Sequence, residues 1–304
     1  MFLTVCLNPT IQKTLSFSSV IPGTVNRTGN HRLDASGKGV NVTRVLNQLG
    51  EKAVHLTQLG GEMKPLFLSL CEQDGLKVEW VESSSQIRFC YTMLTKDGVV
   101  TELVEESEPV GAETESLLLE KYNSILEKFS CLIISGTKAA GFSDAVFPEM
   151  VRTAKEKGMR IILDIKGNDL IACLKYEPDV VKPNLFEFAG TFVPGIIKGN
   201  DVSADDSSAQ EQIRSAMQDV CKKYKCRIIL TDGSRKILTA DNRNYLEIDI
   251  KPVKTVNSIG CGDAFTAGFA AALSEEADLN AAISEGIRCG ALNASLIKPG
   301  VIRL

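Results

Sequence analysis

Residues 257–273 read NSIGCGDAFTAGFAAAL, and the second part of this stretch predicts a buried helix because it consists of small and apolar residues. Gly260 and Gly262 precede the helix and allow the backbone to turn tightly, so that N–H groups can point outward at the helix N-terminus. Such an anion hole suits the charge on a transferring phosphoryl group, and Asp263 could take a proton from an attacking hydroxyl. Taken alone, however, a G-x-G-D motif more often has an aspartate that only caps a helix.

Two other nucleotide-binding motifs are incomplete in this sequence. Phe265 stands where the dinucleotide-binding pattern has its third glycine. The pair Gly37-Lys38 lacks the upstream glycine and the following serine or threonine of a P-loop. The sequence therefore disfavours a dehydrogenase and a P-loop enzyme.

In the rest of the chain, segments with the apolar spacing of a helix alternate with strand-like apolar runs. Apolar residues recur at helical spacing in residues 42–49, 146–154 and 213–224, and strand-like runs follow at 160–165 and 227–230. Strands that alternate with amphipathic helices indicate a mostly parallel sheet with helices on both faces. We therefore expect an α/β fold.

Two segments, about 11–35 and 87–105, depart from this alternation. The second consists of two strand-like runs joined by Lys96-Asp97-Gly98, which predicts a hairpin, and the first is rich in glycine and β-branched residues. Both could form a small β excursion from the main sheet. This excursion is either an ordinary surface hairpin or a lid over a cleft.

Two further motifs carry groups that can bind phosphate or a metal ion. In residues 35–41, ASGKGVN, glycines on both sides of Lys38 permit close approach to a ligand, although this lysine could also lie in a solvated loop. In residues 180–187, VVKPNLFE, the oxygens of Asn184 and Glu187 fall on one face of a turn and are suitable ligands for Mg²⁺. Read locally, the second motif is better explained as an Asn cap with a Glu three residues later.

Composition and charge narrow the classes of function. The 304 residues have a formal net charge of −4 and no long basic run, which argues against a nucleic-acid partner. The nine cysteines are scattered without a C-x-x-C motif, and there are only two histidines, so a zinc site is not expected. We expect the cysteines to be buried, reduced thiols. No apolar stretch is long enough to span a bilayer, and no signal peptide is recognised. We expect a cytoplasmic protein without a membrane partner.

Six motifs occur along the chain in one order. They are Leu7-Asn8-Pro9, Gly37-Lys38-Gly39-Val40-Asn41, Ser135-Gly136-Thr137, Lys182-Pro183-Asn184 with Glu187, Thr231-Asp232-Gly233 and Gly260-Cys261-Gly262-Asp263. Over nearly the whole chain they resemble the PfkB, or ribokinase-like, carbohydrate kinases, and the last motif matches the most specific signature of that family. Val25-Asn26-Arg27, Thr101-Glu102-Leu103 and Asn257-Ser258 resemble its phosphofructokinase and tagatose-6-phosphate kinase branch.

The resemblance implies a role for each matching residue. Asp263 would be the catalytic base, and Gly260, Cys261 and Gly262 would supply the anion-hole amides. The acceptor sugar phosphate would be bound by Lys38, Arg88, Gly37, Gly39, Asn41 and Gln12, with Arg27 a weaker candidate. Thr231 and Gly233 would bind ATP together with Asn184, Gly260 and Gly262, and Asn184 and Glu187 would organise Mg²⁺.

The same resemblance implies a fold and an assembly. Residues 1–304 would form a single kinase domain, a three-layer αβα sandwich with a mostly parallel central sheet. The segments 11–35 and 87–105 would form its β lid. Lids of this kind can clasp a second subunit, so a homodimer through the lid is a further expectation.

Three positions depart from the resemblance: Ser36 in place of a glycine and Asp232 in place of an apolar residue are small departures, and Gln12 is the larger one. Members of this branch usually follow the opening Asn-Pro with an Asp that binds acceptor hydroxyls, whereas this chain has Gln12, which can hydrogen-bond but carries no charge. The expected activity is transfer of the ATP γ-phosphoryl group to a hydroxyl of a ketohexose phosphate. The 1-phosphofructokinase, 6-phosphofructokinase and tagatose-6-phosphate kinase types stay open, as do a kinase of an unphosphorylated sugar or nucleoside and a catalytically silent sugar-phosphate sensor.

Overall fold

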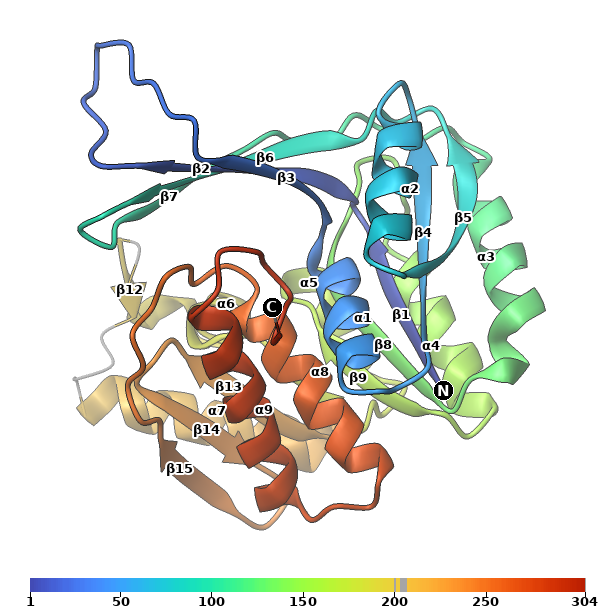
Figure 1. Ribbon diagram of the computed structural model, residues 1–304. Helices are drawn as coiled ribbons and strands as arrows, with labels where there is room; N and C mark the ends of the chain where they lie inside the picture. Colours follow the sequence, from blue (N-terminus) through green and yellow to red (C-terminus); the bar gives the residue numbers. More distant parts are fainter. Residues whose placement is uncertain (200, 203–206, 304) are drawn as a thin grey trace. The chain divides into compact units, whose positions relative to one another are not determined.

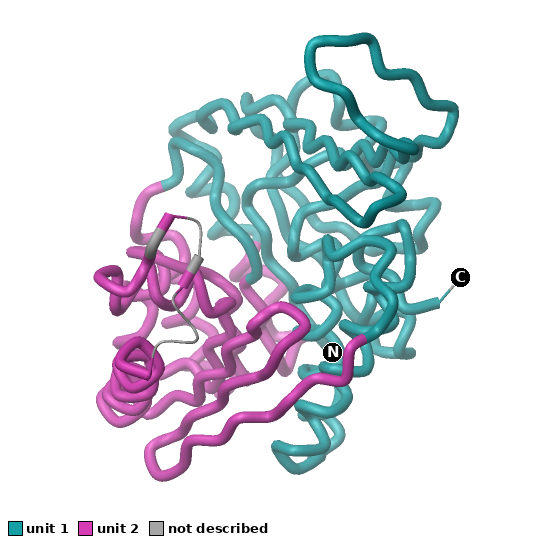
Figure 2. The backbone as a smooth tube through the Cα atoms, turned by 90° about the vertical axis from the view of Figure 1, so that its left-hand side faces the viewer, with its two compact units in different colours: residues 1–121, 135–142, 253–304 teal, residues 122–134, 143–252 magenta. Residues whose placement is uncertain are grey.

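The computed structural model describes residues 1–199, 201–202 and 207–303. The backbone divides into two compact units (Figure 2). Unit 1 comprises Met1–Lys121, Ser135–Phe142 and Val253–Leu304, and unit 2 comprises Tyr122–Ile134 and Ser143–Pro252. The chain therefore leaves unit 1 and returns to it twice.

The sheet of unit 1 is parallel, with strand order β8-β1-β4-β5 (Figure 1). Its strands are β1 (Phe2–Leu7), β4 (Ala53–Gly60), β5 (Lys77–Ser83) and β8 (Cys131–Lys138), and β8 begins in unit 2 and ends in unit 1. Every residue of β1 and β4 is buried, as expected for parallel strands that are covered on both faces. The helices are α1 (Lys38–Gln48), α2 (Lys64–Gln73), α3 (Thr114–Ile125, which continues into unit 2), α8 (Cys261–Ser274) and α9 (Leu279–Ala294).

Unit 2 continues from β8 with the order β15-β14-β13-β10-β9-β8. Strands β9 (Arg160–Asp164), β10 (Val180–Val181) and β13 (Arg227–Asp232) are parallel, whereas β14 (Lys236–Ala240) and β15 (Tyr245–Asp249) are added antiparallel. The remaining elements are α4 (Val146–Glu156), α5 (Gly167–Leu174), α6 (Leu185–Phe192), α7 (Ser207–Tyr224) and the short pair β11 (Ile197–Lys198) and β12 (Asp201–Val202), with 3-10 turns at Leu126–Lys128 and Pro194–Ile196. The mostly parallel α/β architecture that the periodicities indicate is confirmed.

A second, four-stranded sheet in unit 1 has the order β3-β2-β6-β7. It consists of β2 (Thr10–Phe17), β3 (His31–Ser36), β6 (Arg88–Thr95) and β7 (Val100–Val104) (Figure 1). These strands lie in the two segments that lack helical periodicity, and β6 and β7 form an antiparallel hairpin around Lys96-Asp97-Gly98. We call this element the small sheet.

The two faces of the small sheet differ because side chains alternate along each strand. Ile11 and Ala35 belong to a hydrophobic cluster that includes Phe67 and Cys71 of α2. The opposite face is polar, and there Gln12 Nε2 donates to Thr92 Oγ1 at 2.5 Å. A slip of one residue in register would exchange the two faces, so this alternation fixes which side chains face the polar side.

Among the helices in the described part of the chain, none combines the length and hydrophobicity needed to cross a membrane.

Candidate active site

The N-terminus of α8 is built around Gly260, which is the N-cap residue with φ 83° in the left-handed region. A Cβ atom at this position would lie 2.7 Å from the backbone nitrogen of Gly300, so any other residue would be strained by its conformation and by its neighbour. Cys261 and Gly262 lie in the first turn, where N–H groups point out of the helix and carry its positive partial charge. The Cys261 N–H also makes a long contact, 3.4 Å, with the carbonyl of Ser258.

Asp263 lies in the same first turn and is 6% exposed. Its Oδ2 atom accepts a hydrogen bond of 2.8 Å from Nδ2 of Asn41, which lies in the first turns of α1. The N-termini of two helices that are distant in sequence are therefore joined at this carboxylate. A hydrogen-bonded carboxylate beside helix N–H groups is arranged to accept a proton from a hydroxyl next to a developing anion.

The loop before α1 is formed by glycines with little room for a side chain. Gly37 is the N-cap of α1 with φ 112°, and Lys38 is the first helical residue and is partly buried. A Cβ atom on Gly39 would lie 2.7 Å from Cε1 of His55 and 2.9 Å from Cβ of Cys6. These glycines let the backbone that carries Lys38 pack directly on β1 and β4.

Arg88 is brought to the same end of unit 1 by the register of the small sheet. Thr10 on β2 is paired with Ser36 on β3 and with Arg88 on β6, so Arg88 lies two strands away from the residue that precedes Gly37-Lys38. Its Nη1 donates to the carbonyl of Glu105 at 3.0 Å. Its Nε is buried and has no hydrogen-bond partner within the described residues. A buried guanidinium N–H without an acceptor is suited to an anionic ligand.

Gln12 and Arg27 are placed differently. Gln12 lies on the polar face of the small sheet, 3% exposed, opposite Asp34 on β3 and Cys90 on β6. Arg27 lies in the exposed segment 18–30 between β2 and β3, and nothing in the structure brings it to Asp263. The structure therefore joins Asn41 to Asp263, places Lys38 on the same helix as Asn41, and aligns Arg88 in the small sheet with the residue before Gly37.

The two thiols nearest to this centre stay protonated. Burial raises the pKa of the Cys6 thiol and that of the Cys261 thiol, and the negative charge of Asp263 acts in the same direction on both. Neither sulfur is therefore activated as a nucleophile. Asp263 is the group in this cluster with the chemistry of a base.

In unit 2, Asn184 and Glu187 form a capping box at the start of α6. Asn184 Oδ1 accepts from the Glu187 N–H at 2.8 Å, and the Asn184 N–H donates to Glu187 Oε2 at 3.0 Å. This is the local alternative that the sequence favoured. Glu187 Oε1 is 3.9 Å from Lys166 Nζ. A carboxylate and an amide oxygen at this helix start are hard ligands that fit Mg²⁺ held partly through water and phosphate.

Thr231 lies near the carboxyl end of β13, next to this capping box, and Gly233 directly follows the strand. Thr231 forms an isolated parallel bridge with Asn184, and Gly233 lies in the turn to β14 with φ 55°. At the ends of the neighbouring strands β9 and β10, Lys182 Nζ and Asp164 Oδ2 form a buried ion pair at 3.5 Å. Open α/β sheets bind ligands at the carboxyl ends of their strands, and these residues share that edge. Across residues 1–199, 201–202 and 207–303, no group of three or more His, Cys, Asp or Glu side chains is arranged to hold a metal ion.

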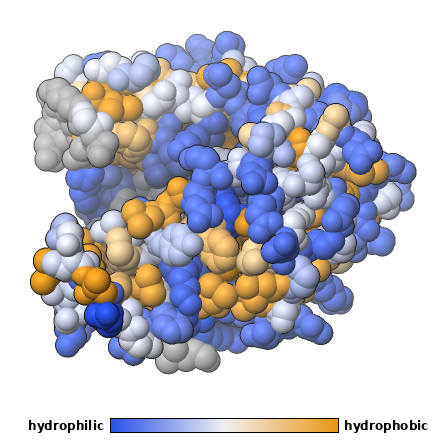
Figure 3. All heavy atoms as spheres, turned by 90° about the horizontal axis from the view of Figure 1, so that it is seen from above, coloured by the Kyte–Doolittle hydropathy of each residue, from blue (hydrophilic) through white to orange (hydrophobic). Residues whose placement is uncertain are grey.

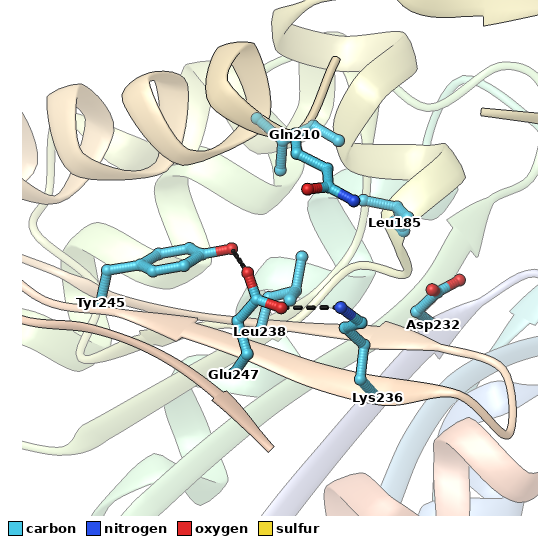
Figure 4. A pocket seen from close by; sticks show the side chains of 8 residues that line it. Leu185, Gln210, Asp232, Lys236, Leu238, Tyr245 and Glu247 are labelled. Carbon is cyan, nitrogen blue, oxygen red and sulfur yellow. Dashed lines mark hydrogen bonds and ion pairs between the residues drawn. The ribbon is translucent and has the colours of Figure 1, made fainter. Parts of the chain in front are cut away.

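A pocket in unit 2 borders these residues, because its lining includes Leu185, which follows Asn184, and Asp232, which lies between Thr231 and Gly233. It is lined by α6, α7 and strands β13 to β15, and Figure 4 shows Gln210 and Leu185 facing Tyr245, Glu247 and Lys236. Three of its polar groups are paired with one another, because Glu247 accepts from Lys236 Nζ at 2.7 Å and from the Tyr245 hydroxyl at 2.9 Å. Asp232 is paired with Arg235 outside the lining. We assign no ligand to this pocket.

The sequence reasoning did not identify Arg44, which is buried beside Asn41 and donates to its Oδ1 atom at 2.9 Å. A signal was present, since Asn41 and Arg44 are separated by three positions in a helix and such residues share a face. An arginine inside an otherwise apolar helix pattern indicates a specific partner. Asp164 was missed for a different reason, because only the sheet brings it beside Lys182.

The chain is similar to a known protein family and to several solved structures. Residues 4–300 match the family described as pfkB family carbohydrate kinase. Among solved structures, the tetrameric inhibited form of phosphofructokinase-2 from Escherichia coli superposes with a TM-score of 0.83 at 23% identity, covering 96% of this chain and 93% of that one.

Two structures from Thermotoga maritima are also similar. A possible 1-phosphofructokinase has a TM-score of 0.85 at 20% identity, with 98% of this chain and 92% of that chain covered. A ribokinase has a TM-score of 0.72 at 17% identity, with 98% and 94% covered. At these identities the likenesses establish a shared ribokinase-like α/β fold.

Proposed function

Because the chain belongs to the pfkB family of carbohydrate kinases, which transfer a phosphoryl group to an alcohol, we propose that its acceptor is a ketohexose phosphate and its donor ATP. The single observation that carries the proposal is the hydrogen-bonded Asp263 carboxylate at the N-terminus of α8, on the same unit as Lys38 and Arg88. We further propose that both units act as one kinase domain.

Asp263 would remove the proton from the acceptor hydroxyl as that oxygen attacks the γ-phosphorus of ATP. The first-turn amides of Cys261 and Gly262 would stabilise charge on the transferring group. Catalysis would rest on positioning and electrostatics, as is general for phosphoryl transfer. The Asn41 hydrogen bond holds the carboxylate in place during this step.

Lys38 and Arg88 support a phosphorylated acceptor. Two cationic side chains at one end of unit 1 favour an anionic substrate, and Arg88 has a buried Nε donor available for it. The amide of Asn41 is engaged by Asp263 and Arg44. Gly37 and Gly39 would allow the ligand to approach the backbone closely, and Gln12 would offer a neutral polar group beside it. The fructose 1-phosphate, fructose 6-phosphate and tagatose 6-phosphate types all have this chemistry.

Thr231, Gly233 and Asn184 are proposed to bind ATP, and Glu187 with Asn184 to organise Mg²⁺. When bound, the metal ion would neutralise charge on the phosphates of ATP. Glu187 would keep its carboxylate oriented through the capping box, in which one oxygen is already fixed by the Asn184 N–H. The lysines at 166 and 182 would limit the net negative charge at this edge of the sheet.

We also propose that the small sheet closes over the acceptor as a lid and pairs two copies of the chain. Several apolar side chains on its outer strand, on the hairpin turn before that strand and on the segment that joins β2 to β3 are at least half exposed: Ile21, Val25, Val99, Leu103 and Val104. Figure 3, which views the molecule from above Figure 1, shows hydrophobic side chains exposed among polar ones on this side. A flat edge strand with apolar side chains favours association.

An unphosphorylated sugar or a nucleoside is the alternative acceptor, and a sugar-phosphate sensor without catalysis is the alternative class. Lys38 and Arg88 argue against the first, and the intact Gly260–Asp263 segment argues against the second. Gln12, which lacks the charge that related kinases have at this position, gives the sensor its support.

The test is release of ADP from Mg-ATP with fructose 1-phosphate, fructose 6-phosphate, tagatose 6-phosphate, fructose and ribose. We expect turnover on one phosphorylated ketose and little on the two unphosphorylated sugars. Turnover that is fastest on fructose or ribose would contradict the proposed acceptor. Silence on all five with ATP still bound would favour the sensor.

A further inference from the structure

The amide of Asn41 must have one orientation for the bond to Asp263 to exist. An Asn side chain has a donor on one side and an acceptor on the other, and a half turn exchanges them. In the observed orientation Nδ2 faces the Asp263 carboxylate at 2.8 Å. The opposite orientation would direct the Asn41 carbonyl oxygen at a carboxylate oxygen, which is repulsive. Whatever fixes the other side of this amide therefore controls the environment of Asp263.

Arg44 fixes that side. Its Nη1 donates to Asn41 Oδ1 at 2.9 Å, and Ser36 Oγ makes a longer contact of 3.4 Å with the same oxygen. A guanidinium only donates hydrogen bonds, so it accepts no amide N–H in that place. The pairing is thus specific for the orientation in which Asn41 donates to Asp263.

The guanidinium is itself held on its other sides by unit 1. Nε donates to Asp74 Oδ2 at 2.8 Å, Nη2 to the carbonyl of Ala35 at 2.6 Å, and Nη1 also to the carbonyl of Pro299 at 3.1 Å. Arg44 is 3% exposed, so its charge is desolvated and its position is determined by these contacts. Lys298 also pairs with Asp74, so this carboxylate keeps one cationic partner when Arg44 is replaced.

Backbone packing joins this network to the anion hole. A Cβ atom on Gly300 would lie 2.6 Å from Cβ of Asn41, and a Cβ atom on Gly260 would lie 2.7 Å from the Gly300 nitrogen. The segment that offers its Pro299 carbonyl to Arg44 therefore packs against both Asn41 and Gly260. Movement of Arg44 would be transmitted to the base and to the residue that opens α8.

We infer that Arg44 is a positioning residue for phosphoryl transfer, which acts on Asp263 by orienting the amide of Asn41. The inference rests on the proposed function, because it concerns the activity of Asp263. Arg44 is 3% exposed and gives its four hydrogen bonds to Asp74, Asn41, Pro299 and Ala35, so it is enclosed by protein and not presented to a substrate. Its loss should therefore lower kcat and leave substrate binding nearly intact.

The first experiment measures kcat and KM for Arg44→Met, Asn41→Leu and the double variant. We expect Arg44→Met to lower kcat by about 10-fold to 100-fold, the scale of a small misplacement of a catalytic group, with both KM values within about twofold of wild type. In the Asn41→Leu background, Arg44→Met should lower kcat by less than about twofold, because the two act as one unit. Additive losses, or an unchanged kcat in Arg44→Met, would overturn the inference.

Two further variants separate positioning from stability. Asp74→Asn weakens the Nε contact of Arg44 and leaves its bond to Asn41, so it should reduce the melting temperature and retain kcat. Arg44→Lys keeps the charge without the planar fork, so it should recover stability relative to Arg44→Met and not recover kcat. It also replaces Arg44→Met if that variant does not fold. Recovery of kcat in Arg44→Lys would show that charge alone suffices and would refute the inference.

A readout independent of turnover is the side-chain amide of Asn41 in ¹⁵N-asparagine-labelled protein, assigned by its absence in Asn41→Leu. Its protons should exchange with water roughly 10-fold or more faster in Arg44→Met than in wild type and in Asp74→Asn. If the wild-type protein turns over no acceptor, the proposed function fails and this exchange measurement alone decides the role of Arg44. Equal exchange in wild type and Arg44→Met would then reject it.

Discussion

Asp263 and Asn41 are 222 positions apart in the chain, and their hydrogen bond brings the base to the first turns of two helices. Single residues around this bond carry the specificity of the site. Gly260 and Gly300 leave room for the backbone, Arg88 presents a buried donor, and the thiol of Cys261 is kept neutral by burial, which raises its pKa. We therefore assign base chemistry to the Asp263 carboxylate and phosphate binding to Lys38 and Arg88.

The Arg88 assignment predicts a change in KM. Arg88→Ala should raise KM for the phosphorylated acceptor by about 10-fold to 100-fold, because a charge-assisted hydrogen bond contributes about 1.5–3 kcal/mol. The kcat value at saturation and KM for ATP should change little. Arg152→Ala, at an exposed arginine of α4, is the matched control. An unchanged acceptor KM in Arg88→Ala would remove the argument for a phosphorylated substrate.

His55 predicts how stability depends on pH. Burial lowers the pKa of His55 to about 3, its Nδ1 is 3.0 Å from Thr4 Oγ1, and its Nε2 has no partner within the described chain. The folded-state pKa lies below the unfolded value of 6.5, so the unfolded chain binds the proton first as pH falls. The stabilising contribution is complete above pH 6.5 and is lost progressively between pH 6.5 and 3.

At pH 5 this loss should be about 2 kcal/mol relative to pH 7.5. The measurement is the free energy of unfolding in urea at both pH values for wild type and His55→Gln. The difference between the two pH values should shrink by that amount in His55→Gln. His31→Gln, at an exposed histidine, should behave like wild type. An identical pH dependence in all three proteins would show that His55 does not resist protonation in the fold.

The helices and strands determine where the proposed catalytic and binding residues lie. Helices α1 and α8 begin at glycines and direct their N-termini toward the same carboxylate, while the register of β3, β2 and β6 aligns Ser36, Thr10 and Arg88 in one row. In unit 2, α6 begins with a capping box at the carboxyl edge of β9, β10 and β13. Several of the proposed binding residues therefore lie at helix starts, as at Gly37, Gly260 and Asn184, or at the first residue of a strand, as Arg88 does on β6.

A variant of Glu187 can separate its role in capping α6 from its proposed role in binding Mg²⁺. Glu187→Gln keeps an oxygen that can accept from the Asn184 N–H, so the free energy of unfolding should change by less than about 1 kcal/mol. It removes the negative charge, so the Mg²⁺ concentration for half-maximal ADP release should rise by about 10-fold. Asn184→Ser, which keeps a good N-cap, is the companion variant. A large loss of stability with unchanged Mg²⁺ dependence would assign Glu187 to the cap alone.

At the scale of the molecule, the sequence predicted much of the fold because the periodicities are strong. The strand Arg160–Asp164, the helix that contains residues 42–48 and the hairpin around residues 96–98 follow from local pattern and turn chemistry. The antiparallel addition of β14 and β15 was not predicted, since strand direction depends on pairing rather than on local pattern.

Only those parts of the candidate site that depend on local sequence were predicted. The turn at residues 260–263 is a local signal, and the sequence placed it at a helix start, where the structure has it. The contacts that orient Asp263 are not local: the bond to Asn41, the link from Arg44 to Pro299 and the packing of Gly300 on Asn41 join segments more than 200 positions apart. No local pattern encodes them. Asn41 was expected as a substrate ligand, and its contact with Asp263 was not foreseen.

The proposed assembly makes a prediction at this scale as well. Wild-type protein should have twice the mass of one chain by light scattering after gel filtration, and Leu103→Asp on the outer strand of the small sheet should have the mass of a monomer. The charge would be buried between two apolar surfaces in the pair, which is unfavourable. Leu117→Asp, at an exposed leucine of α3, is the control and should remain paired. A monomeric wild type would reject pairing through this sheet.

Whether Asp263 is the catalytic base is decided by phosphoryl transfer in Asp263→Asn, measured as ADP release with Mg-ATP and the preferred phosphorylated ketose. The change removes the base and conserves the shape of the side chain, so we expect wild-type melting temperature within a few degrees, retained ATP binding, and kcat lower by about 10³-fold or more. That result would establish Asp263 as the base of a sugar-phosphate kinase. Turnover within about tenfold of wild type in a folded Asp263→Asn protein would contradict the assignment and the mechanism built on it.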